Sequence, residues 1–211
     1  MNRMTCACIG MLLPIVANAK SDGWEWAVGF GGALNLPQSL SIEMDSGETI
    51  DLGTVNYDTK PFNSPPYYAL RAARWQDSKA WELEFIHHKI YLQSKYLNDR
   101  VTNFEISDGY NLLYGNYAAE ITKGWITRFG VGAVIVHPDV TVDGVRSHGG
   151  YQWSGITTQL ALEREFPLSD AVIFSAEGKL TYSYAKANFT FGSATVPNTA
   201  LHLLAMVKFA P

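Results

Sequence analysis

The stretch AVIFSAEGKLTYSY, residues 171–184, alternates two kinds of side chain along its length. Successive side chains of a β-strand point to opposite faces, so this stretch predicts a strand with one polar and one apolar face. The polar face carries Ser175, Glu177, Lys179, Thr181 and Ser183, and the apolar face carries Val172, Phe174, Ala176, Leu180, Tyr182 and Tyr184. An apolar face toward lipid and a polar face toward an interior are typical of transmembrane β-barrel strands.

The same period of two recurs along the chain, and no stretch shows a sustained helical period. We expect eight strands, at about 24–36, 67–76, 81–91, 110–121, 125–136, 151–166, 171–184 and 200–209. Three connections are short, Gln76–Ala80, Thr122–Gly124 and Pro167–Asp170, and four are long and polar, at about 37–66, 92–109, 137–150 and 185–199. Short periplasmic turns facing long external loops are the outer-membrane pattern. The predicted fold class is therefore all-β, a transmembrane antiparallel β-barrel of eight strands, in which 37–66 has room for a short hairpin above the membrane.

Aromatic residues gather at the expected strand ends beside the short turns. They are Trp24, Trp26, Trp75, Trp81, Trp125, Phe166, Phe174 and Phe209. Aromatic rings collect at the headgroup level of membranes, so these residues predict a girdle at the periplasmic interface.

The first nineteen residues have the layout of a secretory signal peptide. An apolar run, Met4–Val16, is followed by Ala17-Asn18-Ala19, which is an A-x-A cleavage pattern. We therefore expect residues 1–19 to be removed and residues 20–211 to form one outer-membrane β-barrel domain.

Composition excludes several classes of function. The formal net charge of −4 offers no basic surface for nucleic acid. The two cysteines, Cys6 and Cys8, lie in the expected signal peptide, which excludes disulfides and cysteine chemistry from the mature chain. Aromatic residues make up 13% of the chain and charged residues only 17%, which suits a sheet between lipid and a packed polar interior. We expect a monomer embedded in the bacterial outer membrane.

Six charged residues fall on inward faces of the expected strands. A barrel of eight strands is filled by side chains, and charges buried in so narrow a space must pair. The sequence therefore predicts an internal ion-pair network of Arg71, Glu82, Glu84, Arg128, Glu177 and Lys179.

A second polar group is expected at the opposite, extracellular end of the strands. His87 and His88 run toward the second long loop, Asp108 returns from it, and His137 ends the fifth strand. Imidazoles with a carboxylate suit a divalent cation, and we expect His88, Asp108 and His137 to be its ligands. Neighbouring His87 and His88 point to opposite faces of a regular strand, so only one of them serves an interior site unless a bulge intervenes.

A structural role explains the same residues equally well. His87 and Lys89 would then lie at the lipid headgroups, and His88 would pack in the upper lumen. A hydrolytic triad at Ser107-Asp108 is a further alternative, although such pairs are common in turns. The sequence contains no nucleophile elbow, glycine-rich phosphate loop or metalloprotease helix.

Several motifs together resemble the family of outer-membrane lipid A oxidases. They are Pro65-Pro66-Tyr67-Tyr68, Glu84-Phe85-x-His87-x-Lys89-x-Tyr91, Ser107-Asp108-Gly109-Tyr110-Asn111, Gly130-Val131-Gly132 and Glu177-x-Lys179-x-Thr181-Tyr182. The resemblance covers the chain from about Tyr57 onward. It implies an oxygen-dependent oxidation of the proximal glucosamine of lipid A to an aminogluconate unit, with help from divalent cations.

The resemblance also implies candidate residues for this chemistry. The matched positions are His87, Lys89, Tyr91, Asp108, Asn111, Glu177 and Lys179, and His88 of the rim group joins the first five as a catalytic candidate. The expected partner is lipid A or lipopolysaccharide, arriving laterally from the outer leaflet. The alternative is a non-enzymatic barrel with a structural or surface-interacting role. A pore for small apolar solutes is disfavoured by the charges expected in the lumen.

Overall fold

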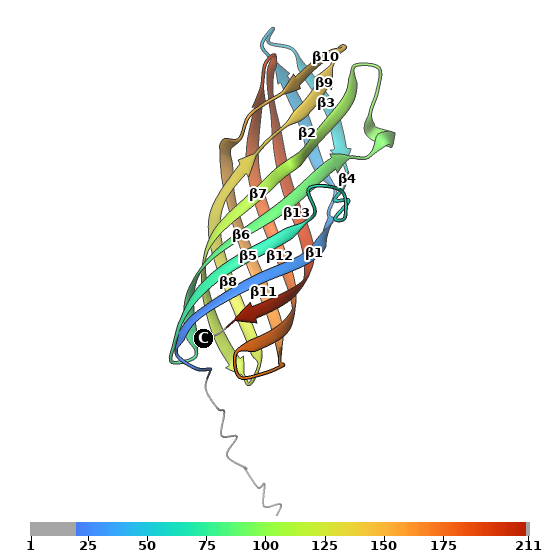
Figure 1. Cartoon of the computed structure of the whole chain (residues 1–211). Coiled ribbons are helices and arrows are strands. Elements are labelled where there is room, and N and C mark those ends of the chain that lie inside the picture. Colours follow the sequence, from blue (N-terminus) through green and yellow to red (C-terminus); the bar gives the residue numbers. More distant parts are fainter. Residues whose placement is uncertain (1–19, 210–211) are drawn as a thin grey trace, which may run out of the picture.

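The computed structural model describes residues 20–209. The expected signal peptide, with both cysteines, and the last two residues lie outside this part. The described chain forms one antiparallel sheet of thirteen strands with a short 3₁₀ helix, η1 (Ser94–Tyr96) (Figure 1). Across residues 20–209, no helix is long and apolar enough to cross a membrane.

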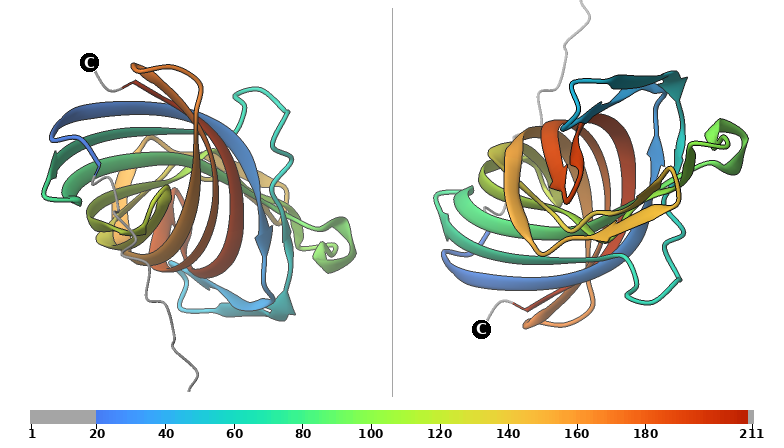
Figure 2. Two further views of the ribbon diagram at one scale, coloured as in Figure 1. Left: turned by 90° about the horizontal axis from the view of Figure 1, so that it is seen from below. Right: turned by 90° about the horizontal axis from the view of Figure 1, so that it is seen from above.

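Eight strands form a closed ring of hydrogen-bonded ladders, which the end views of Figure 2 show. In order around the ring they are β1 (Gly23–Asn35), β5 (Tyr68–Gln76), β6 (Lys79–Leu92), β7 (Val101–Thr122), β8 (Trp125–Val136), β11 (Gln152–Pro167), β12 (Val172–Phe189) and β13 (Gly192–Phe209). β13 pairs back with β1, from Trp26↔Phe209 to Asn35↔Ala200, so each of the eight strands is paired on both sides. These eight are the strands that the sequence predicts.

Five further strands lengthen the wall at the end of the long connections. They are β2 (Gln38–Met44), β3 (Thr49–Val55), β4 (Tyr57–Asp58), β9 (Asp139–Val142) and β10 (Val145–His148). β2 pairs with β13 and β9 pairs with β7, because β7 and β13 begin well before the predicted boundaries. The count of eight is therefore correct for the ring and too low for the whole sheet. The β2–β3 hairpin confirms the hairpin expected within 37–66.

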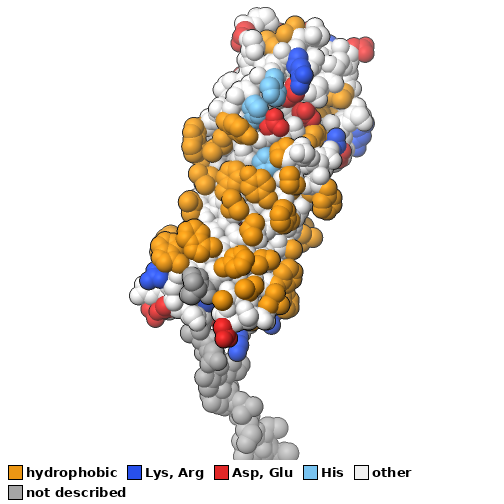
Figure 3. Space-filling model, viewed as in Figure 1, with side chains coloured by type: hydrophobic (Ala, Val, Ile, Leu, Met, Phe, Trp, Pro, Cys, Tyr) orange, Lys and Arg blue, Asp and Glu red, His pale blue; other side chains and the backbone are white. Residues whose placement is uncertain are grey.

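The outward face of the ring is apolar over most of its height, as Figure 3 shows for one side. Large exposed side chains from all around the ring contribute, among them Phe30, Leu83, Phe129, Ile156, Leu160, Leu180 and Leu203. The predicted aromatic girdle is present with one correction. Trp75 is only 1% exposed, because it follows the inward-facing Arg71 and Ala73 at a period of two, and its Nε1 donates to Glu25 Oε1 at 3.4 Å.

The predicted ion pairs fill the inside of the ring near the short turns. Arg128 lies 2.7 Å from Glu82, 2.6 Å from Glu163 and 2.6 Å from Glu177. Arg71 contacts the same three carboxylates and Glu84, which also pairs with Lys179, and all of these side chains are buried. Glu163 and its further partner Lys208, 3.0 Å away, were not among the predicted members of the network.

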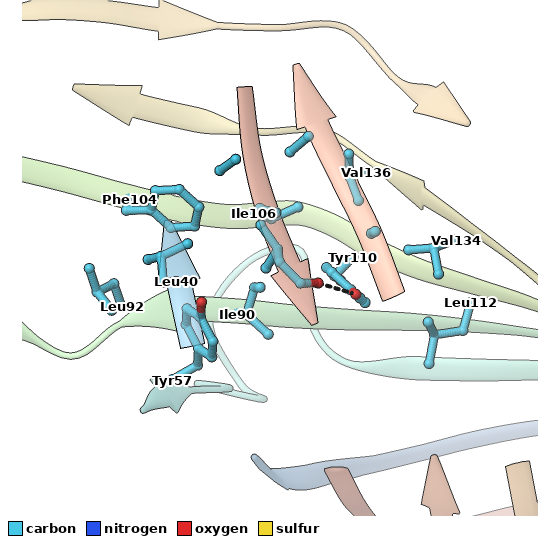
Figure 4. Close-up of a cluster of buried hydrophobic side chains, with 14 of the residues drawn as sticks. Leu40, Tyr57, Ile90, Leu92, Phe104, Ile106, Tyr110, Leu112, Val134 and Val136 are labelled. Atoms are coloured by element: carbon cyan, nitrogen blue, oxygen red, sulfur yellow. Dashed lines mark hydrogen bonds between the residues drawn. The ribbon is translucent and has the colours of Figure 1, made fainter. Parts of the chain in front are cut away.

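Above the ion pairs, toward the long connections, the interior contains a large apolar cluster. Figure 4 shows Ile90, Phe104, Ile106, Leu112 and Val134, which belong to this cluster and come from β6, β7 and β8. Tyr110 lies in the same cluster, and its hydroxyl donates to the carbonyl oxygen of Val196 at 2.9 Å. Buried polar side chains, among them His88 and His202, also lie inside the ring. Side chains thus fill the interior at this level as well.

Arg128→Ala tests the internal network. The change leaves three buried carboxylates with one fewer cation, and we expect it to lower the free energy of unfolding by about 3–5 kcal/mol. Urea unfolding in lipid vesicles measures the free energy of unfolding. The matched control is Arg164→Ala, at the partly exposed short-turn end of β11, which is expected to cost less than about 1 kcal/mol. Equal stability of the two variants would contradict the central role of Arg128.

Arg100 ties together the tips of the β2–β3 and β9–β10 hairpins. Its guanidinium donates to Glu48 of the first and to Asp143 of the second. These hydrogen bonds lower the pKa of both carboxyl groups. Because the pKa of each carboxyl group is lowered in the folded state, the contact stabilises the folded state fully at pH values above the ordinary carboxyl pKa. This stabilisation is lost as the pH falls through the lowered pKa.

We therefore expect Arg100→Ala to raise the pKa of both Glu48 and Asp143 toward ordinary values. Carboxyl-carbon NMR titration of the folded protein in micelles measures both groups. The wild-type protein, titrated under the same conditions, is the reference. A titration of Asp143 that is unaffected by loss of Arg100 would show that the contact does not persist in solution.

Candidate functional site

An irregular bulge interrupts the β6–β7 ladder at the height where the outer face becomes polar. His88 pairs with Tyr110 and Ile90 pairs with Ile106, so Lys89 lies opposite three residues, Ser107–Gly109. Gly109 has a φ of +134°, a conformation that favours glycine. Bulges redirect side chains out of the regular alternation, and here the Asp108 side chain becomes 44% exposed.

Three potential metal ligands meet beside this bulge. The rim cluster consists of Asp108, His137 and His148, which each offer one ligand atom within 4.8 Å of the others. Asp108 Oδ2 lies 3.2 Å from His137 Nδ1, and the rings of His137 and His148 are 4.8 Å apart. Figure 3 shows histidine and acidic side chains gathered on the outer surface above the apolar band.

The backbone fixes the three segments that carry the rim cluster. The amide of His137 donates to the carbonyl oxygen of Gly109 at 3.1 Å, which joins the end of β8 to the bulge. β10 pairs with β9, and β9 with β7, so His148 is brought back over Asp108. The Tyr151 ring stacks on His137 at 4.8 Å, and its hydroxyl donates to the Asp108 carbonyl oxygen at 2.9 Å.

Asp139 adds a second carboxylate behind His148. Its Oδ2 lies 3.6 Å from His148 Nδ1, and Arg146 donates two hydrogen bonds to the same carboxylate. These hydrogen bonds lower the pKa of Asp139, which keeps it ionised. The carboxylate is thus able to orient the imidazole of His148.

His87 lies on the outer side of the wall, below the rim cluster. It shares the outward face of β6 with Leu83 and Phe85, stacks on Tyr68 at 5.1 Å, and its Nδ1 lies 2.8 Å from Asn111 Oδ1. Its buried Nε2 has no hydrogen-bond partner among residues 20–209. Of the candidate catalytic residues, His87 and Asn111 therefore form a pair on the same outer face as Asp108.

His88 is placed elsewhere, which corrects the expected ligand set. It is fully buried inside the ring, with Nε2 3.1 Å from Asn35 Oδ1 and its ring 5.1 Å from that of His202. Since adjacent residues of β6 point to opposite faces, His88 does not join Asp108 and His137. His148, which was not among the expected ligands, lies beside Asp108 and His137 instead.

A local signal for His148 was nevertheless present. Asp143-Gly144 lies between two valines, and a two-residue Asp-Gly turn is a strong hairpin signal. Both residues have positive φ, 49° and 78°, as such a turn requires. This β9–β10 hairpin by itself predicts that His148 returns to the neighbourhood of His137.

Lys89 and Tyr91, two further candidate catalytic residues, contact the 59–66 segment. Lys89 Nζ donates to the carbonyl oxygens of Asn63 and Pro65, at 2.9 and 2.8 Å. The Tyr91 ring lies under the ammonium group of Lys60, 4.3 Å from its centroid. Both contacts hold the 59–66 segment beside β6. The matched positions Glu177 and Lys179 lie inside the ring, in the ion-pair network.

An apolar groove lies on the outer wall below the polar residues. It has a volume of about 450 Å³ and is lined by Trp26, Val28, Leu70, Leu83, Phe85 and Leu113, among others. Phe85 pairs with Leu113, two residues below the pairing of His87 with Asn111. The groove therefore reaches up to the polar outer face.

Comparison with known proteins identifies the fold. No family model and no curated protein matches the chain. Among solved structures, the outer membrane protein AlkL is 12% identical, with a TM-score of 0.51 over 100% of this chain and 97% of AlkL. OprG from Pseudomonas aeruginosa is 12% identical, with a TM-score of 0.49 over 90% of this chain and 98% of its own. Neisserial surface protein A is 10% identical, with a TM-score of 0.47 over 89% and 96%.

The chain has the fold of outer-membrane β-barrel proteins. The AlkL likeness carries this conclusion, together with the closed ring of ladders, and at 12% identity it extends to the fold alone. In this barrel the rim cluster lies at the end of the long connections, on the outer side of the wall.

Lys89→Met tests the structural role of Lys89. The change keeps most of the length of the side chain but removes two charge-assisted hydrogen bonds to the 59–66 segment, so this segment should become more mobile. We expect limited chymotryptic cleavage after the exposed Phe62 to accelerate severalfold, as measured by mass spectrometry of the fragments. Lys95→Met, in η1, should leave that cleavage rate unchanged. Equal cleavage rates in both variants would contradict this structural role and leave Lys89 available as a catalytic candidate.

Proposed function

We propose that this protein resides in the bacterial outer membrane as a monomer and acts on the headgroups of outer-leaflet lipids. The apolar outward face of the ring supports membrane insertion, since a monomer in water rarely exposes so large a contiguous apolar surface. The expected signal peptide agrees with export. Short turns would then face the periplasm and the long connections the cell exterior.

The observation that carries the proposal is the position of the polar residues. His87, Asn111 and the rim cluster lie on the outer side of the wall, directly above an apolar groove. A ligand that fits both has acyl chains below and a polar headgroup above. A lipid that diffuses in the outer leaflet would reach this face laterally, without entering the barrel.

The resemblance to lipid A oxidases supplies the finer proposal, oxidation of lipid A. C1 of the proximal glucosamine, as a lactol, would lose two electrons and two protons to O₂, which gives a lactone and hydrogen peroxide. Water then opens the lactone to the aminogluconate unit, so the lipid gains one oxygen atom. All bonds made and broken lie in the headgroup, at the height of the polar residues.

His87 is the candidate base for the hydroxyl proton. Its Nε2 has no hydrogen-bond partner in the described part of the chain, and the contact between Nδ1 and Asn111 fixes the orientation of the ring. Because Nε2 is buried, a substrate reaches it only after side chains around His87 move. A divalent cation held by Asp108 and His137 would supply Lewis-acid or redox chemistry next to this base.

The interior supports a role at the outer face over a pore. Ion pairs fill the lower part of the described barrel, and apolar side chains together with buried polar residues such as His88 fill the upper part, which argues against a path for a solute along the axis. A non-enzymatic structural or surface-interacting barrel is the competing account. It explains the fold equally well, and it predicts that lipid A stays unchanged.

Mass spectrometry of lipid A tests the proposal, with this chain expressed in an aerobic heterologous host whose lipid A carries a free C1 hydroxyl. We expect a gain of one oxygen atom with the wild type and at least about a tenfold loss of product with His87→Ala, since removal of a general base typically costs about 10²–10⁴ in rate. Glu43→Ala, on the exposed β2, is the control and should retain full conversion. Unmodified lipid A from cells with folded wild-type barrel would favour the non-enzymatic account.

A further inference from the structure

We infer that Asp108, His137 and His148 bind one divalent transition-metal ion as a 2-His-1-carboxylate donor set. The three side chains come from the β7 bulge, the end of β8 and the end of β10, and they meet on the outer face. This set differs from the sequence-based expectation in its third ligand. The same donor set with open positions is the one used by non-haem Fe²⁺ oxygenases.

The distances fit a single ion after small side-chain movements. Metal–ligand bonds of about 2.0–2.2 Å place two donor atoms at most about 4.4 Å apart. The three ligand atoms already lie within 4.8 Å of one another, and Asp108 Oδ2 lies 3.2 Å from His137 Nδ1. The side chains of Asp108 and His148 are 44% and 52% exposed, so both are free to rotate toward a cation.

His137 supplies a second, independent observation. Its Nδ1 is buried, and although it faces Asp108 it makes no aligned hydrogen bond with any residue from 20 to 209. A buried polar atom without a partner carries a desolvation cost, which a bound cation would remove. Stacking on Tyr151 holds the imidazole in place, and the hydroxyl of Tyr151 also holds the backbone of Asp108.

Asp139 completes the surroundings of such a site. Metal-ligating histidines commonly direct their other ring nitrogen to a carboxylate, which fixes the ring and strengthens the ligand. Asp139 Oδ2 lies 3.6 Å from His148 Nδ1, and Arg146 holds this carboxylate from the other side. His148 Nε2 is then the nitrogen left for the ion.

The donor chemistry selects the class of metal. Calcium and magnesium prefer sites built wholly from oxygen ligands, whereas imidazole with one carboxylate suits Fe²⁺, Co²⁺ and Zn²⁺. Three protein ligands leave coordination positions open for water or for a headgroup oxygen. The link from this site to oxidation rests on the proposed function, but the binding of the metal does not depend on it.

Titration of the purified, folded barrel with Co²⁺ tests the inference through visible absorption, and Zn²⁺ is then added as the competitor. We expect one Co²⁺ per chain, displaced by Zn²⁺, which suits the same imidazole and carboxylate ligands, and an affinity at least about tenfold weaker in His148→Ala and in Asp108→Asn. His87→Ala is the matched control, since it removes an imidazole from the same face without touching the rim cluster. The mobility of unheated samples on gels verifies that each variant is folded.

The outcomes separate this inference from the proposed function. Absence of saturable binding by the wild type, or equal affinity in wild type and His148→Ala, would overturn the metal site. Absence of saturable metal binding together with lipid A that gains oxygen would overturn the site and leave the oxidase standing. Metal binding with unmodified lipid A would support the site and contradict the oxidase.

Discussion

The ladder between β1 and β13 is the contact on which the rest of the structure depends. Ten residue pairs, from Trp26↔Phe209 to Asn35↔Ala200, join the first strand of the ring to the last. In hydrocarbon, unpaired backbone groups cost several kcal/mol each, so a sheet of this kind is stable in a membrane only when it closes. Closure in this register also assigns every side chain to one face, since a slip by one residue would exchange inside and outside.

The narrow interior that follows from closure is divided into two levels. Near the short turns, each buried arginine contacts at least three carboxylates, and such contacts offset the desolvation of the charges. Higher up, aromatic and aliphatic residues such as Phe104 and Tyr110 pack the inside. A binding site for a large ligand therefore has little space inside, and the outer wall remains available for it.

The bulge opposite Lys89 and the β9–β10 hairpin together create the rim cluster. The bulge exposes Asp108, the hairpin returns His148, and the ladder of β9 with β7 brings the two into contact. On the same outer face, His87 faces Asn111 above the apolar groove. A polar, histidine-rich surface at this height suits the headgroup of a lipid whose chains lie against the wall.

The sequence by itself determined the eight strands of the ring, their inward and outward faces and six members of the internal ion-pair network. These features follow from alternation with a period of two, which is a local property of each strand. The same alternation predicts an inward position for Trp75, whereas the clustering of tryptophans at strand ends predicted an outward one. Only the tertiary structure decided that His148, and not His88, lies beside Asp108 and His137. The Asp143-Gly144 turn predicts the β9–β10 hairpin locally, but the position of this hairpin over Asp108 depends on the bulge and on the pairing of β9 with β7. The register between strands distant in sequence is not specified by a local pattern.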